Sequence, residues 1–594
     1  MIRLEEAAKG YEGGFRTLGT PENWDRISEA YRAEIFRRAE EYARQPYPMR
    51  KATDFLAFVR NGSRQADEGP YFFRRKKLCW EATACRMGRE EMLDDVVDGI
   101  WCICEESSWV ISAHNVNPIP GAPAPAEYPL PEVSRPYIDL FSAQTGMILT
   151  LVRQMLGEAL DRVSPALCLR ISREIRQRIL EPFLAHHDFW WMGFIRKDLC
   201  NWTPWIVSNV LCCAMREPMA EAERRETVIR ACGMLDRWLE VVPEDGGCDE
   251  GAGYWNMAGG ALLDCLELLE EATEGRLSFW QEEKIRNILA FPGKAEIGEG
   301  YFLNFADCDV KPFLSGERIQ TAGEKTGDPA LCSLGNRLRQ NVSAEMDDVP
   351  HYSRLLRLLF HAPAEGAAFR PDSDIWFPDL QVRIARRGPW TLAAKGGHNG
   401  ESHNHNDVGS FMLYLDGAPE IVDAGNMTYT AKTFSDRRYE LWNTRSAYHN
   451  VPMIGGREQL AGTERRAEKT AWLPEGLELE MRGAYDPAAG IRTCMRRMEL
   501  REEGLRLTDR IETETPEEVC WVFLFRNRPE RTARGMETER MLLGLPEGWE
   551  TETEEIPVTD ARMGRNWPGS LWRVKIRDRQ AREHRAEWVF TRKE

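Results

Sequence analysis

The sequence lacks the features of a membrane protein or a nucleic-acid binder. Nothing in its 594 residues approaches the run of about eighteen apolar residues that a membrane-spanning helix needs. Its net charge of −17 is the opposite of what a polyanionic partner attracts. The start of the chain has no apolar segment of the secretory type. We therefore expect a cytoplasmic protein with no membrane and no nucleic-acid partner.

Cysteine is present, but its pattern excludes a disulfide scaffold. The 15 cysteines are scattered without a compact framework. Cys102 and Cys104 form one close pair and Cys212 and Cys213 another, and neither has zinc-finger spacing. We expect reduced thiols, and we interpret the two close pairs as buried small hydrophobic side chains.

The pattern of apolar residues changes near residue 365. The chain is too long for one ordinary core. In its first part, apolar residues recur at three- and four-residue steps among charged ones, as in amphipathic helices. Regular helix pairs of this kind suit an α/α toroid or solenoid, although no exact repeat is visible. The clearest helical segments are 24–44, 172–187, 222–243 and 258–275.

After residue 366, short runs alternate apolar and polar residues, which indicates β-strands. One of them predicts a hairpin with Asp416 and Gly417 at its turn. Helices followed by strands favour separate parts over alternating βαβ units. We predict an N-terminal α/α toroid, an incomplete α/α barrel, over residues 1–365 and a C-terminal antiparallel β-sandwich over residues 366–594.

Histidine is scarce and clustered. Of 10 histidines, four lie between His398 and His449. On a strand or at a strand entry, His403 and His405 would point to the same face. Asp423, at the far end of the predicted hairpin, can come back beside His405. Two histidines and a carboxylate are a standard ligand set for Zn²⁺. Hydrogen-bonded histidines or an acid–base pair explain the cluster as well, so spacing alone leaves the metal open.

Four segments resemble a known family. Residues 396–425 and 438–456 look like the C-terminal β-domain of heparinase II/III-type polysaccharide lyases, which are related to the oligoalginate lyases. Residues 198–211 and 244–269 look like inner helices and loops of that family's α/α toroid. The resemblance implies a lyase that cleaves uronic-acid-containing glycans by β-elimination and leaves a 4,5-unsaturated uronate end.

The resemblance also implies roles for individual residues. β-Elimination needs a group that neutralises the uronate carboxylate, a base for the C5 proton and an acid for the leaving oxygen. By similarity, Asn201 contacts the carboxylate, Tyr254 is the catalytic tyrosine, and His403 is catalytic or contacts the carboxylate. Tyr439 lies about where alginate-acting relatives carry a second catalytic tyrosine. The assignment of acid and base stays open.

The resemblance makes zinc the expected cofactor. It implies that His405, Asp423 and His449 hold the ion, which is chiefly structural and fixes a loop of the β-domain. His403 then faces the substrate. Zinc acting directly on the uronate as a Lewis acid is the less favoured alternative.

Candidate substrate-binding residues follow from the chemistry of an anionic sugar. Aromatic side chains stack on sugar rings, which makes Trp109, Trp202 and Trp205 candidates, with His114 as a polar contact. Core packing explains such aromatics equally well. Arg438 belongs to a basic set that can hold an anionic sugar in an acidic protein. The other members of this set are Lys432, Arg437, Arg445 and Arg457.

Two departures from the family pattern concern Asn201. It is followed by Trp202, where several alginate-acting relatives have a histidine, so one proton-transfer partner is missing. Heparinase II carries a histidine at the position of Asn201 itself. Both differences shift acid–base work toward Tyr254 and His403, and they leave the substrate open.

Three classes of function remain. The leading one is a lyase acting on imported uronate oligosaccharides, in which Glu250 contacts the substrate. The second is a glycoside hydrolase that uses Asp249 and Glu250 as its acid pair. The third is a non-catalytic uronate-binding protein. The expected partner is an anionic oligosaccharide, and a homodimer is left open.

Overall fold

The chain packs into two compact units. The computed structural model describes residues 3–13, 21–115, 128–339, 342, 352–363, 368–430, 432–545 and 548–593. The helical unit comprises Met1–Val242, Asn256–Leu289 and Ser315–Phe369. The sheet unit comprises Pro243–Trp255, Ala290–Leu314 and Arg370–Glu594. Two segments that precede residue 365 in the sequence therefore pack with the strands.

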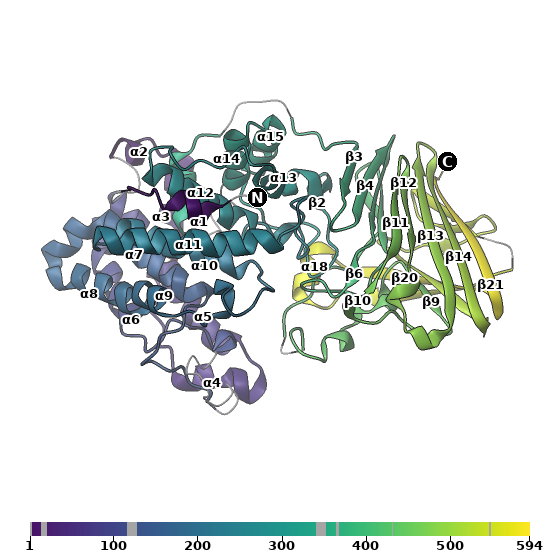
Figure 1. Cartoon of the computed structure of the whole chain (residues 1–594), viewed down its shortest axis with the longest axis horizontal. Helices are drawn as coiled ribbons and strands as arrows, with labels where there is room; N and C mark the ends of the chain where they lie inside the picture. The colour runs from purple at the N-terminus through teal and green to yellow at the C-terminus, as the bar shows by residue number, and fades with distance from the viewer. Residues whose placement is uncertain are drawn as a thin grey trace. The chain divides into compact units, whose positions relative to one another are not determined.

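Helices make up the first unit (Figure 1). Within it, α7 packs against α8 and α10, and α10 packs against α11 and α12. None of the helices in the described ranges is long and apolar enough to cross a membrane. The helices are α1 Leu4–Ala8, α2 Pro21–Asp25, α3 Glu29–Ala43, α4 Ala52–Asn61, α5 Gln65–Arg86, α6 Leu93–Cys104, α7 Leu140–Val163, α8 Pro165–Ile175, α9 Glu181–Ala185, α10 Trp202–Arg216, α11 Glu221–Val241, α12 Gly259–Ala272, α13 Glu283–Ala295, α14 Gly316–Thr326, α15 Pro329–Leu338 and α17 Tyr352–Phe360.

Local chemistry sets the helix ends. Asp139 caps α7 by accepting from the Ser142 backbone N–H at 2.7 Å, and the Ser142 hydroxyl accepts from the Asp139 N–H at 2.8 Å. The predicted helix 172–187 is interrupted by the π-helical turn Arg176–Leu180, which joins α8 to α9. This turn lies just before Pro182, which has no backbone N–H to continue the α-helical bonding.

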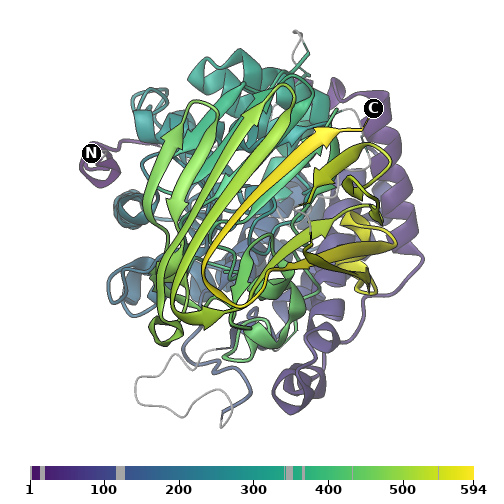
Figure 2. The same cartoon turned by 90° about the vertical axis from the view of Figure 1, so that its right-hand side faces the viewer.

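Two large antiparallel sheets make up most of the second unit. One has the strand order β11-β12-β13-β14-β21-β18-β17-β16. The other has the order β19-β20-β15-β8-β7-β5-β4-β3, with β9 paired to β15. Neither sheet closes into a barrel. Figure 2 shows β13, β14 and β21 side by side in the first sheet.

The two sheets bury one apolar core, to which Leu413 and Phe523 contribute from one sheet and Leu507 and Trp588 from the other. This confirms the predicted helical N-terminal part and antiparallel C-terminal sandwich. The strands are β1 Glu296–Gly298, β2 Tyr301–Phe302, β3 Asp374–Phe377, β4 Val382–Arg387, β5 Trp390–Lys395, β6 His398–Asn399, β7 Phe411–Leu415, β8 Ala418–Ile421, β9 Pro452–Ile454, β10 Gly462–Arg466, β11 Glu468–Leu473, β12 Gly476–Glu480, β13 Ile491–Arg501, β14 Gly504–Glu517, β15 Val519–Phe525, β16 Glu530–Arg531, β17 Gly535–Glu537, β18 Met541–Gly544, β19 Glu550–Pro557, β20 Ser570–Arg577 and β21 Ala581–Arg592, and the short helix α18 Ala561–Asn566 precedes β20.

The predicted hairpin is present as β7 and β8. Asp416 and Gly417 form its turn, with φ values of 49° and 74°. Two successive residues with positive φ match the right-handed twist of the paired strands, which is why Asp-Gly is favoured there. β8 ends at Ile421, so Asp423 lies just beyond the C-terminal end of this strand.

Candidate active site

Three segments of the sheet unit bring side chains together around His403. Tyr254 lies in the 3-10 turn Ala252–Tyr254, Asp307 lies after β2, and Tyr429 lies after β8. The ring centroids of Tyr254 and His403 are 4.8 Å apart. The two tyrosine hydroxyls are hydrogen-bonded to each other. The Tyr429 hydroxyl lies 3.3 Å from His403 Nδ1, which also lies 3.0 Å from Asp307 Oδ2. A hydrogen-bonded chain thus runs from Tyr254 to Asp307.

His403 lies in the loop that leads into β7 and not on a strand. Residues 400–410 contain no strand, and His403 has a φ of 55° in the left-handed region. The Arg438 guanidinium supports this conformation by donating to the carbonyls of His403 at 2.8 Å and Asn404 at 2.9 Å. His403 and His405 do approach one carboxylate, but through this bent loop and not through the pleat of a strand.

Burial keeps the two tyrosines protonated. It raises the pKa of Tyr254 well above the usual value, and the neighbouring Tyr429 and Glu250 raise it further. Burial likewise raises the pKa of Tyr429, with the charge of Asp307 adding to the effect. At neutral pH both side chains are therefore proton donors, and Tyr254 is a neutral phenol beside an imidazole.

The two acidic residues before Tyr254 have different contacts. Glu250 is 5% exposed, and its Oε1 lies 3.8 Å from His403 Nε2. Asp249 Oδ2 accepts a hydrogen bond from the Ser402 backbone N–H at 3.1 Å. Asp249 therefore supports the His403 loop, whereas Glu250 faces the histidine ring. Their use as a hydrolase pair, and the substrate contact expected of Glu250, remain predictions.

The basic set is largely occupied within the sheet unit. Arg438 donates to three backbone carbonyls and pairs with Asp307 at 2.9 Å. Its guanidinium is thus committed to the loop, and its predicted contact with substrate is untested. Tyr439 accepts from Asn404 Nδ2 at 3.0 Å. Three other members are ion-paired: Lys432 and Arg437 with Glu440, and Arg445 with Glu458.

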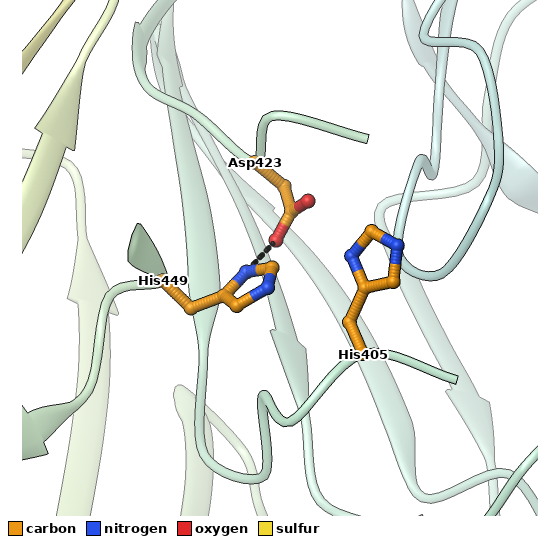
Figure 3. A group of neighbouring side chains, drawn as sticks. All are labelled: His405, Asp423 and His449. Carbon is orange, nitrogen blue, oxygen red and sulfur yellow. Dashed lines mark hydrogen bonds and ion pairs between the residues drawn. The ribbon is translucent and has the colours of Figure 1, made fainter. Parts of the chain in front are cut away.

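His405, Asp423 and His449 come together as a buried group of possible metal ligands. One atom from each lies within 4.8 Å of the others, and all three residues are 0% exposed. His405 Nδ1 and His449 Nε2 have no hydrogen-bond partner among the described residues. Figure 3 shows these two nitrogens and the Asp423 carboxylate turned toward one another.

The donor chemistry of this group fits a metal ion. Two imidazole nitrogens and a carboxylate are ligands that Zn²⁺ takes readily. A buried ring nitrogen without a partner costs free energy that a metal bond would recover. The outer nitrogen of His405, Nε2, lies 3.0 Å from Asp307 Oδ1, and metal-bound histidines characteristically donate to such a carboxylate. Metal binding itself remains a prediction.

Asn201 lies in the helical unit, directly before α10. It occupies the N-cap position, but its side chain makes no capping hydrogen bond, and it is 8% exposed. The capping interpretation therefore does not account for this asparagine. Its contact with a uronate carboxylate stays a prediction.

The aromatic candidates of the helical unit fall into two pairs. His114 Nδ1 lies 2.9 Å from Asp139 Oδ2, and its ring lies 4.7 Å from the partly exposed ring of Trp202. Trp109 and Trp205 are only 2% and 7% exposed. The Trp109 indole donates to the Ile103 carbonyl at 3.0 Å. Core packing describes these two tryptophans better than an open sugar-stacking face.

Tyr429 and Asp307 are site residues that the sequence did not reveal. Neither belongs to a motif with recognisable spacing. Asp307 precedes the strand-rich part of the chain, and only packing of Ala290–Leu314 with the sheets brings it to His403. Both lie outside the four segments that resemble the family, so the sequence carried no signal for either.

The fold and the site together define a class of protein. Its members have a helical unit and an antiparallel β-sandwich, and the sandwich unit carries a tyrosine–histidine site and a candidate metal centre. Residues 370–587 match the model of the family "Heparinase II/III-like, C-terminal". This confirms the resemblance to heparinase II/III-type polysaccharide lyases. No curated protein matches the sequence.

Solved structures of similar fold span nearly the whole chain. Heparinase III has a TM-score of 0.64 at 13% identity, with 99% of this chain and 88% of that chain covered. Heparan sulfate lyase HepC from Pedobacter heparinus has a TM-score of 0.61 at 13% identity, covering 99% and 86%. Chondroitin AC lyase of Streptomyces coelicolor A3 has a TM-score of 0.51 at 12% identity, covering 99% and 82%. At such identities the likeness establishes the fold.

Proposed function

We propose that this protein is a polysaccharide lyase that cleaves uronic-acid-containing glycans by β-elimination. The observation that carries the proposal is the hydrogen-bonded chain from Tyr254 through Tyr429 and His403 to Asp307. It supplies a proton donor and a proton acceptor side by side within the sheet unit. The match of residues 370–587 to the heparinase II/III-like family model and the fold similarity to heparan sulfate and chondroitin lyases support the same reaction class.

Tyr254 suits the role of general acid. The leaving oxygen at C4 must receive a proton as its bond to carbon breaks. A buried phenol with a raised pKa retains its proton at neutral pH, so it is ready to donate it. The Tyr429 hydroxyl is hydrogen-bonded to the Tyr254 hydroxyl. It can accept a hydrogen bond from the Tyr254 hydroxyl, or donate one to the Tyr254 oxygen as that oxygen loses its proton.

His403 suits the role of base for the C5 proton. Its Nδ1 faces the Asp307 carboxylate, which can only accept a hydrogen bond, so the ring proton sits on Nδ1. Nε2 then carries the free electron pair that can take the C5 proton. Asn201, on the helical unit, is assigned to the uronate carboxylate, where an amide N–H adds no competing negative charge.

The metal centre is assigned a supporting role. Zn²⁺ held by His405, Asp423 and His449 would tie together the His403 loop, the end of β8 and the segment before β9. The natural substrates are proposed to be short oligosaccharides already imported into the cytoplasm.

A product assay tests the proposal. Oligosaccharides of heparan, chondroitin, hyaluronan, alginate and gellan type would be incubated with the protein, and ultraviolet absorbance would report a new C4–C5 double bond. Tyr254→Phe and His403→Ala should each lower kcat by about 100-fold or more on the substrate that is cleaved.

Tyr414→Phe is the matched control, because the buried Tyr414 hydroxyl has no hydrogen-bond partner among the described residues. It should leave kcat unchanged. Saturated products that have gained water would instead support a hydrolase and direct attention to Asp249 and Glu250. Binding of an oligosaccharide without turnover, unchanged in Tyr254→Phe, would support a non-catalytic binding protein.

A further inference from the structure

The carboxylate of Asp307 serves two histidines at once. Its Oδ2 lies 3.0 Å from His403 Nδ1, and its Oδ1 lies 3.0 Å from His405 Nε2. The Asp307 side chain is 3% exposed, so water does not compete for these contacts. Because a carboxylate only accepts hydrogen bonds, the nitrogen that faces it on each ring must carry the proton.

The opposite nitrogens of the two rings are thereby left with free electron pairs. His405 Nδ1 faces His449 and Asp423 (Figure 3). His403 Nε2 lies on the side of Glu250, at 3.8 Å from its Oε1. One ring thus presents its electron pair to the candidate metal site, and the other presents its pair beside Tyr254. A single carboxylate sets both tautomers.

The segment that carries Asp307 is fastened to the segment that carries Asp423. Asn426 Nδ2 donates to the Asp307 carbonyl at 2.8 Å, and Asn304 Nδ2 donates to the Asp423 carbonyl at 3.0 Å. Arg438 completes the arrangement, because one of its nitrogens reaches both Asp307 Oδ1 at 2.9 Å and the His403 carbonyl at 2.8 Å. A shift at the metal site would therefore be passed to His403.

We propose that Asp307 is a positioning residue that couples the metal site to the active site. It fixes the tautomer and orientation of His405 for the metal and of His403 for the substrate. Metal binding would then order His403 through this carboxylate, without the metal touching the substrate. The inference rests on the proposed function, since it takes the metal site and the role of His403 from it.

The variant Asp307→Asn tests the coupling. An amide offers an N–H₂ on one side and an oxygen on the other, so at least one histidine must move its ring proton. We expect the affinity for Zn²⁺ and the kcat of the zinc-saturated protein each to fall by about 10- to 100-fold, with KM nearly unchanged. Nitrogen NMR of protein labelled in its histidine rings should show the changed tautomer.

Asp509→Asn is the matched control. Asp509 is also a buried carboxylate of the sheet unit, bound by Arg496 Nε at 2.8 Å and by the Trp521 indole at 2.8 Å. Its loss should lower stability while zinc affinity and the kcat of the folded protein stay as they were. If Asp307→Asn fails to fold, the unmodified protein still tests the coupling. Removal of zinc from it should shift the NMR resonances of the His403 ring.

The outcomes separate this inference from the proposed function. Asp307→Asn with unchanged zinc affinity, or with full kcat once zinc is saturating, overturns the coupling. Unsaturated products formed by a protein that binds no zinc overturn the coupling and leave the lyase assignment standing. If the protein binds zinc and forms no unsaturated product, the lyase assignment is contradicted. The coupling is then still tested by whether the His403 ring resonances shift when zinc is removed.

Discussion

At the scale of single residues, the site depends on which hydroxyl and which nitrogen hold a proton. Tyr254 is kept neutral by burial and by its neighbours, and His403 is held with its Nδ1 toward Asp307. The two groups thus differ in what they can do: one can donate a proton and the other can accept one. This difference exists before any substrate is bound, because the protein itself imposes it.

The contact between Tyr429 and Tyr254 leads to a prediction at this scale. Tyr429→Phe removes one hydrogen bond to the Tyr254 hydroxyl and one contact with His403 Nδ1. A typical net hydrogen bond is worth about 0.5–1.5 kcal/mol, so we expect kcat to fall by about two- to tenfold, less than in Tyr254→Phe. Steady-state kinetics on the cleaved oligosaccharide measures this.

Tyr485→Phe controls for the loss of a buried tyrosine hydrogen bond, because Tyr485 donates to the Pro452 carbonyl at 2.5 Å elsewhere in the sheet unit. It should lower the Tm and leave kcat unchanged. A Tyr429→Phe variant as active as the unmodified protein would show that Tyr429 is only packed beside the site.

At the scale of elements, the candidate metal centre joins three residues that lie outside the strands. His405 lies in a loop, Asp423 follows β8, and His449 follows the 3-10 turn Ser446–Tyr448. Removal of bound Zn²⁺ by a chelator should therefore destabilise the sheet unit by about 3 kcal/mol when the ion had been present at a hundred times its Kd. Calorimetry with and without chelator measures the fall in Tm, which added Zn²⁺ should reverse.

His449→Ala should abolish this response to chelator. His584→Ala should keep it, because His584 pairs with Asp578 at 2.9 Å as another buried histidine–aspartate contact of the same unit. An unmodified protein whose Tm ignores both chelator and Zn²⁺ would argue against a metal at this site.

The helical unit depends on a buried ion network that links α12, α14 and α17. Arg354 is 1% exposed and binds Asp264, Glu267 and Glu317. Arg354→Met leaves these carboxylates buried without their partner, which should cost about 3–5 kcal/mol. Arg506→Met, which breaks an exposed pair with Glu587, should cost about 1 kcal/mol or less. Equal losses of Tm in the two variants would contradict the importance of the network.

The same network predicts how acid affects the helical unit. Burial alone would raise the pKa of Glu317, but the charge of Arg354 and the contact with His361 outweigh it and lower the pKa. A carboxyl group whose pKa is lowered by folding stabilises the folded state at pH values above its unfolded pKa of about 4.3. This stabilisation is lost as the pH falls through the pKa of the folded state. Glu317→Gln should therefore lower the Tm at pH 6, and the difference should shrink as pH falls below about 4. A difference independent of pH would exclude this contribution.

At the scale of the whole molecule, the order of helices and strands could be read from the sequence because apolar spacing is a local property. The segment 222–243 became α11, Glu221–Val241, and Asp416-Gly417 became the β7–β8 turn. The assignment of residues 290–314 to the sheet unit could not be read, because it depends on contacts with strands far along the chain.

The candidate site was predictable where the sequence carried motifs and not where it depended on tertiary packing. The family resemblance grouped His405, Asp423 and His449, and the structure brings them together. Asp307 reaches the histidines only through packing, and Tyr429 has no spacing signal. Of the two placements considered for His403, a strand or a strand entry, the structure shows no strand: the residue lies in the loop that leads into β7, with a positive φ.

The measurement that tests the central claim most directly is the mass of the products formed in water labelled with heavy oxygen. β-Elimination adds no water, so the products should sum to the mass of the substrate, carry no label and include one unsaturated uronate end. A product that has gained labelled water would show hydrolysis and would contradict the assignment of Tyr254 and His403 as the acid and base of an elimination.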